Sequence, residues 1–183
     1  MKNLVALVAM CLILIGCETL PGGVSTHISD FDGTREVSME PAVVPTGSMV
    51  ARLRIGAYWS SKNPEVAYLI AETAGATRVR REAGLELSLD GDITSLDSDE
   101  TFTEIDRAQA FTGDSQTWSS RGFTTSPGFI EKLRDASDIR VRLRIGQTEY
   151  IEGRIETDGM NAGVYNGLGA FVEEVERQKQ ELE

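Results

Sequence analysis

The sequence predicts an α+β domain in which an antiparallel β-sheet or open sandwich is covered by two helices, the second at the C-terminus. Polar and apolar residues alternate along several segments between residues 50 and 155, as they do in strands with one buried face. Apolar residues also recur at helical spacing, first near residue 130 and again over 164–175. This order of strands, helix, hairpin and helix is typical of an α+β fold.

Five segments before residue 110 are predicted as strands: 50–58, 66–73, 76–81, 85–89 and 101–107. Residues 66–73 carry apolar side chains on both faces, which fits a central strand covered on both sides or a short buried helix. Residues 85–89 alternate strictly and run into Asp90-Gly91, a dipeptide typical of tight turns.

Residues 112–125 are rich in serine, threonine and glycine, and we predict a long loop that carries Trp118. A short helix is expected next, with Ser126 as N-cap and Pro127 at the first helical position. Its apolar face consists of Phe129, Ile130, Leu133 and Ala136. We expect this helix to end near Ser137.

Apolar residues alternate with arginine over 139–145, and a hairpin must follow. A two-residue turn would set Leu143 opposite Tyr150, whereas a three-residue loop over 146–148 sets Leu143 opposite Ile151. The longer loop keeps one face apolar and is therefore predicted. On the outer face it gives two opposed pairs, Arg142 with Glu152 and Arg140 with Arg154.

The chain ends in a predicted helix of about 20 residues. Its apolar stripe is Val164, Leu168, Phe171, Val172 and Val175. Glycines at 163, 167 and 169 lower helix propensity by ~1 kcal/mol each, but they allow close approach to a sheet.

The N-terminus has the pattern of a secretory leader. Met1-Lys2-Asn3 is short and basic, and residues 4–15 are twelve uncharged residues. At about 1.5 Å per residue, a helix of that length spans only ~18 Å, too short for a ~30 Å hydrocarbon core. Residues 1–16 are therefore predicted to be a cleaved signal peptide.

The end of this leader, Leu14-Ile15-Gly16-Cys17, resembles the lipobox of bacterial lipoproteins. The resemblance implies cleavage before Cys17, a diacylglyceryl thioether on its sulfur and an acylated amine. Two or more acyl chains hold a protein firmly on a membrane, whereas one alone does not. In the Gram-negative lipoproteins that this motif resembles, an aspartate directly after the cysteine commonly retains the protein in the inner membrane. Because Glu18 stands there instead, the resemblance implies the periplasmic face of the outer membrane. An ordinary signal peptide, cut elsewhere, is the alternative.

After cleavage, residues 17–34 are predicted to be a lipidated N-terminus and flexible tether, and 35–183 a single globular domain. The chain has two cysteines, Cys11 in the leader and Cys17. The mature domain would then have neither a free thiol nor a disulfide, although an oxidising envelope would permit one.

The net charge of −11 argues against nucleic acid as a partner, because phosphate binding needs a basic patch. Candidate catalytic chemistry is weak. His27 is the only histidine, so a catalytic triad or a zinc site of the usual type is not expected, and we assign no catalytic residue, metal or cofactor. The acidic stretch 90–100 suggests calcium, but its spacing departs from the EF-hand, and a solvated hairpin turn and loop in an acidic protein explains it as well.

Arginines on strand-like segments are the more informative feature. The candidate anion-binding face consists of Arg52, Arg54, Arg140, Arg142 and Arg144. Such a face could bind carboxylates or phosphates through bidentate hydrogen bonds from the guanidinium groups, as in peptidoglycan stems or lipid A. The alternative is that the arginines pair with Glu86, Glu149, Glu152 and Glu156 across strands. Tyr58, Trp59 and Trp118 could stack on a sugar, although packing roles are commoner for tryptophan.

Residues 50–183 are also similar to uncharacterised envelope lipoproteins. The resemblance rests on a Tyr-Trp strand, "LSLDGD", a Ser-Pro helix start, "RVRLRIG" and an apolar C-terminal helix. It implies no activity. We therefore expect a lipid-anchored envelope protein with a non-catalytic binding or structural role, whose partner is peptidoglycan or an envelope protein. The alternative is an envelope hydrolase that cleaves peptidoglycan or glycan through paired carboxylates.

Overall fold

The computed structural model describes residues 22–47, 52–74, 84–99, 107–108, 117–146, 148–159 and 161–182. The leader, Cys17, the predicted strand 76–81 and most of the predicted strand 101–107 lie outside these residues. No helix within the described part of the chain is long and apolar enough to cross a membrane.

Ten strands form two antiparallel sheets over the described residues, and two helices accompany them. Sheet A has the order β1-β2-β3-β4-β8-β7 and contains β1 (Val24–Ile28), β2 (Arg35–Val44), β3 (Leu53–Ser60), β4 (Ala67–Ala74), β8 (Thr117–Thr125) and β7 (Arg107–Ala108). Sheet B has the order β10-β9-β5-β6 and contains β10 (Tyr150–Ile155), β9 (Ile139–Arg144), β5 (Gly84–Leu89) and β6 (Asp92–Asp97). The helices are α2 (Pro127–Asp135) and α3 (Gly163–Gln180). The predicted α+β class is confirmed.

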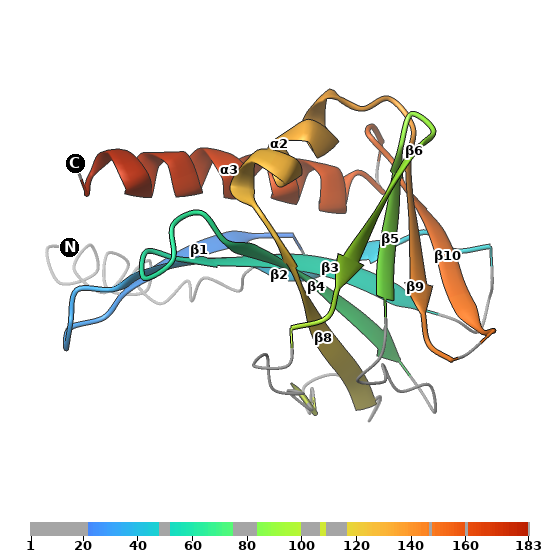
Figure 1. The fold of residues 1–183 in the computed structure, drawn as a ribbon, viewed down its shortest axis with the longest axis horizontal. Coiled ribbons are helices and arrows are strands. Elements are labelled where there is room, and N and C mark those ends of the chain that lie inside the picture. The colour runs from blue at the N-terminus through green and yellow to red at the C-terminus, as the bar shows by residue number, and fades with distance from the viewer. Residues whose placement is uncertain are drawn as a thin grey trace, which may run out of the picture.

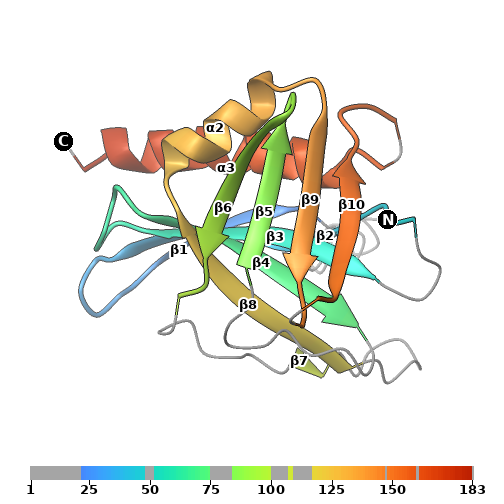
Figure 2. The same cartoon turned by 45° about the vertical axis from the view of Figure 1, so that its right-hand side comes forward.

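Sheet B and the two helices share one side of sheet A. In Figure 1 the long strands of sheet A run across the molecule, sheet B rises steeply on the right, and α3 lies above the long strands. Figure 2 shows the strands of sheet B in front of sheet A and crossing it. The core lies between these layers, and its largest fully buried side chains include Trp59, Phe123 and Phe171. Steep crossing of two sheets is one of the standard packings, in which strands pass from one sheet to the other at the corners.

Two isolated bridges join the sheets at such corners. Beyond the end of β2, Thr46 pairs with Gly153 of β10, and Arg154 N donates to Pro45 O at 3.1 Å. Beyond the end of β6, Ser98 pairs with Phe123 of β8, and Asp99 N donates to Gly122 O at 3.0 Å. One bridge connects the end of β2 to β10 and the other connects the end of β6 to β8. The strands of the two sheets therefore form a closed ring.

The predicted hairpin between β9 and β10 is confirmed in its register. Leu143 pairs with Ile151, Arg142 with Glu152 and Arg140 with Arg154. The loop spans the predicted three residues, and Ile145 N donates to Glu149 O at 2.9 Å beneath it. Asp90 and Gly91 have positive φ angles of 51° and 101°, as the tight turn between β5 and β6 requires.

Helix α3 buries all five residues of its predicted stripe. It packs on β2 at Gly167, where an added Cβ would lie 2.6 Å from Met39 Cε and 2.7 Å from Gly22 O. Helix α2 also begins as predicted, since Ser126 Oγ accepts a hydrogen bond from Phe129 N at 3.1 Å. The spacing of apolar residues thus predicts α3, and the N-cap residue predicts the start of α2.

Three segments differ from the sequence-based prediction. Residues 92–97, within the acidic stretch interpreted as a solvated turn and loop, form strand β6. The predicted loop 112–125 is wrong over 117–125, which form β8, because small hydroxyl side chains allow this strand to be covered on both faces. Ser119 and Ser120, on opposite faces of β8, are both buried. Residues 24–28 of the predicted tether form β1, which pairs with β2 from Val24 opposite Met39 to Ile28 opposite Arg35.

Candidate functional site

The five arginines of the candidate anion-binding face lie on two different sheets. Arg140, Arg142 and Arg144 alternate with buried residues on β9 and are exposed on the outer face of sheet B. Arg54 lies on the outer face of sheet A, and Arg52 directly precedes β3. Because the apolar faces of the two sheets meet in one core, their outer faces point in opposite directions. The arginines therefore form two separate groups.

On sheet B the arginines pair with acidic residues of the neighbouring strands. Arg142 lies between Glu152 on β10 and Glu86 on β5, with closest ion-pair distances of 2.6 and 3.2 Å. Arg144 reaches the other oxygen of Glu86 at 3.1 Å. The guanidinium of Arg142 also lies 4.8 Å from the ring centroid of Tyr150. The alternative of cross-strand pairing is thus confirmed for Glu86 and Glu152.

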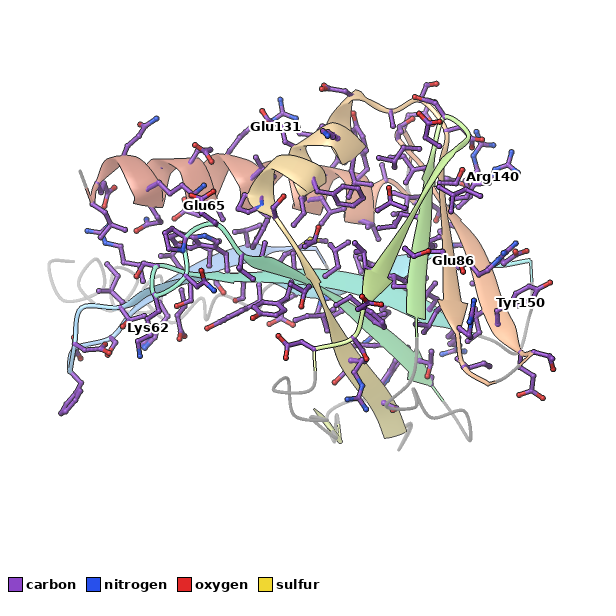
Figure 3. All side chains as sticks on the ribbon, in the orientation of Figure 1. Lys62, Glu65, Glu86, Glu131, Arg140 and Tyr150 are labelled. Carbon is purple, nitrogen blue, oxygen red and sulfur yellow. The ribbon has the colours of Figure 1, made fainter. Side chains whose placement is uncertain are left out.

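A cavity of about 490 Å³ opens on the outer face of sheet B, and we call it the arginine groove. Figure 3 shows Arg140 and Tyr150 on this side of the molecule, away from α3. The size lies within the usual range of small-ligand sites. The groove is lined by Pro45, Gly47, Glu86, Ser88, Ile93, Arg140, Val141, Arg142, Glu152, Gly153 and Arg154.

At one end of the groove, two of its lining arginines contact the carboxylate of Asp138, which lies beside the lining residues. Arg140 and Arg154 lie directly opposite each other on β9 and β10. Arg140 Nε and Nη2 each lie 3.0 Å from Asp138 Oδ2, while Arg154 Nε lies 3.1 Å from Asp138 Oδ1. The side chains of Arg140 and Arg154 are 69% and 64% exposed. The two exposed guanidinium groups thus share a single negative charge, that of the partly buried Asp138 carboxylate.

The turn between β5 and β6 holds Asp138 in place. Asp90 N donates to Asp138 O at 2.9 Å, and Asp90 Oδ1 accepts from Asp138 N at 2.8 Å. The same carboxylate accepts from the Ser137 hydroxyl at 2.7 Å and from its backbone N–H at 3.0 Å. These hydrogen bonds, that of the Ser137 side chain above all, hold the pKa of Asp90 below its usual value. Asp90 thus acts as a cap for the segment that carries Asp138.

The outer face of sheet A contains a different arrangement. Arg54 lies 3.9 Å from Glu72 and its guanidinium lies 3.9 Å from the ring centroid of Trp118. Glu72 and Trp118 are both buried. Arg54 therefore packs between an aromatic ring and a carboxylate.

The three aromatic residues considered for sugar stacking do not form one platform. Trp59 is fully buried, and its Nε1 donates to Pro64 O at 3.0 Å. Trp118 is 5% exposed and contacts Arg54. Tyr58 packs against Tyr68 with ring centroids 6.3 Å apart. Burial, and secondarily Glu36, raises the pKa of Tyr58 to about 12. Packing explains both tryptophans.

The other candidate residues are dispersed. His27 is exposed on β1 and does not line the groove. Of the acidic stretch 90–100, Asp90 caps residues 137–138, and Asp92 and Asp97 lie at the two ends of β6. Within the described ranges, no three candidate ligands come together in a metal-binding group.

Sequence reasoning did not select Asp138, Tyr150 or Arg154 as site residues. The predicted hairpin register did place Arg154 opposite Arg140, so the signal for Arg154 was present. Asp138 could not be found in this way, because its position depends on the contact with Asp90. Comparison with protein-family models, curated proteins and solved structures found no match to this chain.

Proposed function

We propose that this protein is a cell-envelope lipoprotein, anchored by lipid on Cys17, whose domain binds an envelope ligand without catalysis. The arginine groove is the proposed binding surface. The observation that carries the proposal is a concave, arginine-lined face on a chain whose net charge is −11. A cluster of exposed guanidinium groups on an otherwise acidic protein favours anionic ligands, because each offers several N–H donors in a planar fork.

The geometry of the groove favours binding over hydrolysis. A glycosidase needs one carboxyl that donates a proton and a second carboxylate that acts as nucleophile or base. The two carboxylates that line the groove, Glu86 and Glu152, both accept hydrogen bonds from Arg142 at 3.2 and 2.7 Å. Arg142 therefore engages both groups that a hydrolase would use, and we do not propose hydrolysis.

The proposed anchor would hold the domain near a bilayer. Cys17 lies five residues before Gly22, where the described chain begins next to Gly163 of α3. Five residues span at most ~18 Å when fully extended. Since β1 begins at Val24 and belongs to sheet A, the folded domain starts almost directly after the proposed lipid.

Two measurements test the proposal. Mass spectrometry of the N-terminal peptide of the mature protein should show an acylated Cys17, and an unmodified thiol there contradicts the anchor. The full chain, purified in detergent, should co-sediment with isolated peptidoglycan or cross-link to an envelope protein. The variant R140Q/R142Q/R154Q should lose this binding. The control K62Q/K132Q/R134Q removes the same charge from exposed positions elsewhere and should retain it. Equal binding by the two variants contradicts the proposed surface.

A further inference from the structure

We propose that Arg140 and Arg154 bind the terminal carboxylate of a peptide at one end of the arginine groove. The inference rests on the proposed function, because it names the ligand class of that surface. Its starting point is the pairing of two arginines with one carboxylate, that of Asp138.

The arginines on the outer face of sheet B are not all matched by carboxylates in the same way. Arg142 and Arg144 are matched by Glu86 and Glu152, with which they form ion pairs. Arg140 and Arg154 carry two positive charges against the single negative charge of Asp138. Like charges directly opposite on neighbouring strands repel each other, so a second anion is favoured here. One carboxylate supplies the missing charge.

Arg140 and Arg154 differ in how their hydrogen-bond donors are used. A guanidinium has five N–H donors, and Arg140 directs two of its nitrogens to Asp138 Oδ2. Arg154 Nε approaches Asp138 Oδ1 at 3.1 Å, but that oxygen accepts no aligned hydrogen bond. Apart from this Nε contact, no side chain of the described residues engages the Arg154 guanidinium, so its terminal N–H donors remain available to a ligand.

A row of paired residues runs across the groove. Ile93, Ser88, Arg140 and Arg154 lie side by side on β6, β5, β9 and β10. Ile93 and Arg140 are thus two strand spacings apart, ~10 Å, which is about the length of three extended residues. Ile93 is 70% exposed and offers an apolar contact. A peptide end with small apolar side chains fits this row, with its carboxylate at the arginines.

A phosphate monoester fits the charge balance less well. It carries about −1.5 to −2 charges at neutral pH, whereas the two arginines exceed the one carboxylate that contacts them by a single charge. The bidentate fork of arginine also matches the two oxygens of a carboxylate. Peptide carboxylate is therefore the favoured class, and phosphate binding becomes an outcome of the test.

The test uses three probes on the full chain in detergent: acetyl-trialanine, its C-terminal amide and glycerol 3-phosphate. Binding is followed by the NMR signals of the arginine Nε–H groups and by calorimetry. Acetyl-trialanine should shift the signals of Arg140 and Arg154, and the amide should not. R154Q should weaken binding of the acid about tenfold, whereas R134Q, which removes an exposed charge on α2, should not.

Three results would overturn the inference: tighter binding of glycerol 3-phosphate than of acetyl-trialanine, equal binding of acid and amide, or no shift of either arginine signal. Thermal melting of R154Q and R134Q checks that both variants are folded. The co-sedimentation experiment separates this inference from the proposed function. If the full chain binds peptidoglycan through the arginine groove but the peptide acid leaves Arg140 and Arg154 unchanged, only the carboxylate site fails.

Discussion

Arg140 lies directly opposite Arg154 on neighbouring strands, and both guanidinium groups contact the carboxylate of Asp138. A like-charge pair at directly opposed positions destabilises a sheet, and the shared carboxylate offsets part of this cost. The arrangement is rigid at its base, because the main chain of Asp138 is held by Asp90. A substitution of Asp138 therefore tests how its negative charge affects binding at this end of the groove.

Asp138→Asn removes the shared negative charge and leaves the shape of the side chain unchanged. We expect severalfold tighter binding of acetyl-trialanine at low ionic strength, with the gain shrinking as salt is added. Stability should fall by less than ~1 kcal/mol, since Arg140 and Arg154 are mostly exposed. Calorimetry at two salt concentrations and urea unfolding measure these effects. Asp158→Asn, at an exposed position after β10, is the control and should change neither.

Gly167→Ala tests the close contact between α3 and sheet A. Alanine favours a helix by up to ~1 kcal/mol, but its Cβ would lie 2.7 Å from Gly22 O and 2.6 Å from Met39 Cε. We expect a net loss of ~1–3 kcal/mol in urea unfolding. Gly169→Ala is the matched control, because its Cβ would meet only the Arg134 side chain, with Cδ at an ordinary 3.5 Å and Cγ at 3.8 Å. It should stabilise the protein, and a Gly167→Ala variant as stable as this control contradicts the account.

Glu174→Gln tests the polar network at the C-terminal end of α3. Hydrogen bonds from Arg177 above all, and then from Thr26 and Gln178, outweigh burial and hold the pKa of Glu174 at about 2. In the unfolded chain this carboxyl protonates near 4.5. Its contribution is therefore present above about pH 4.5 and is lost as pH falls towards 2.

The variant should be less stable by roughly 1–2 kcal/mol at pH 7, with solvent screening taken into account. It should also lose less stability than the wild type between pH 4.5 and 2. Urea unfolding across this range gives both quantities. Glu176→Gln, which removes an exposed carboxylate one residue from Arg177, should follow the wild-type acid profile. If both variants reduce the loss of stability between pH 4.5 and 2 equally, the network around Glu174 is not the cause of that loss.

Ser126→Ala removes the side-chain cap of α2. Ser126 Oγ accepts from Phe129 N at 3.1 Å, and the loss of such a cap costs about 1 kcal/mol. Ser126→Asp should restore most of the stability, because its carboxylate can accept the same hydrogen bond and favours a helix N-terminus. Thermal unfolding of the two variants is the measurement. Equal melting temperatures for the alanine and aspartate variants would show that the cap contributes little.

Elements with a strong local pattern were predictable from sequence. The β9–β10 hairpin has one register that keeps Leu143 and Ile151 on the same face, and the structure has that register. The start of α2 at Ser126-Pro127 and the buried stripe of α3 are likewise local signals. In each case the residues that decide the structure lie within about a dozen positions of one another.

Other features depend on contacts that no local pattern contains. Strand β8 is covered on both faces, so its serines did not alternate with apolar residues and indicated a loop. The alternation of Arg54 and of Arg142 predicted an outward direction for each, but it could not reveal that the two belong to different sheets. The groove is lined in part by Pro45 and Gly47, from the corner beyond β2. Asp138, whose carboxylate contacts Arg140 and Arg154, is held by Asp90, almost fifty residues earlier in the chain.

The corner bridge between Thr46 and Gly153 also constrains the order in which the protein can fold. Its two residues are more than a hundred positions apart in the chain, so the ring of strands cannot close until nearly all of the polypeptide has been made. Contacts of such long range slow folding and leave strand edges open in the meantime. Gly153 has no room for a side chain, since a Cβ would lie 2.6 Å from Val44 Cγ1. Closure of the ring therefore depends on a single small residue of β10.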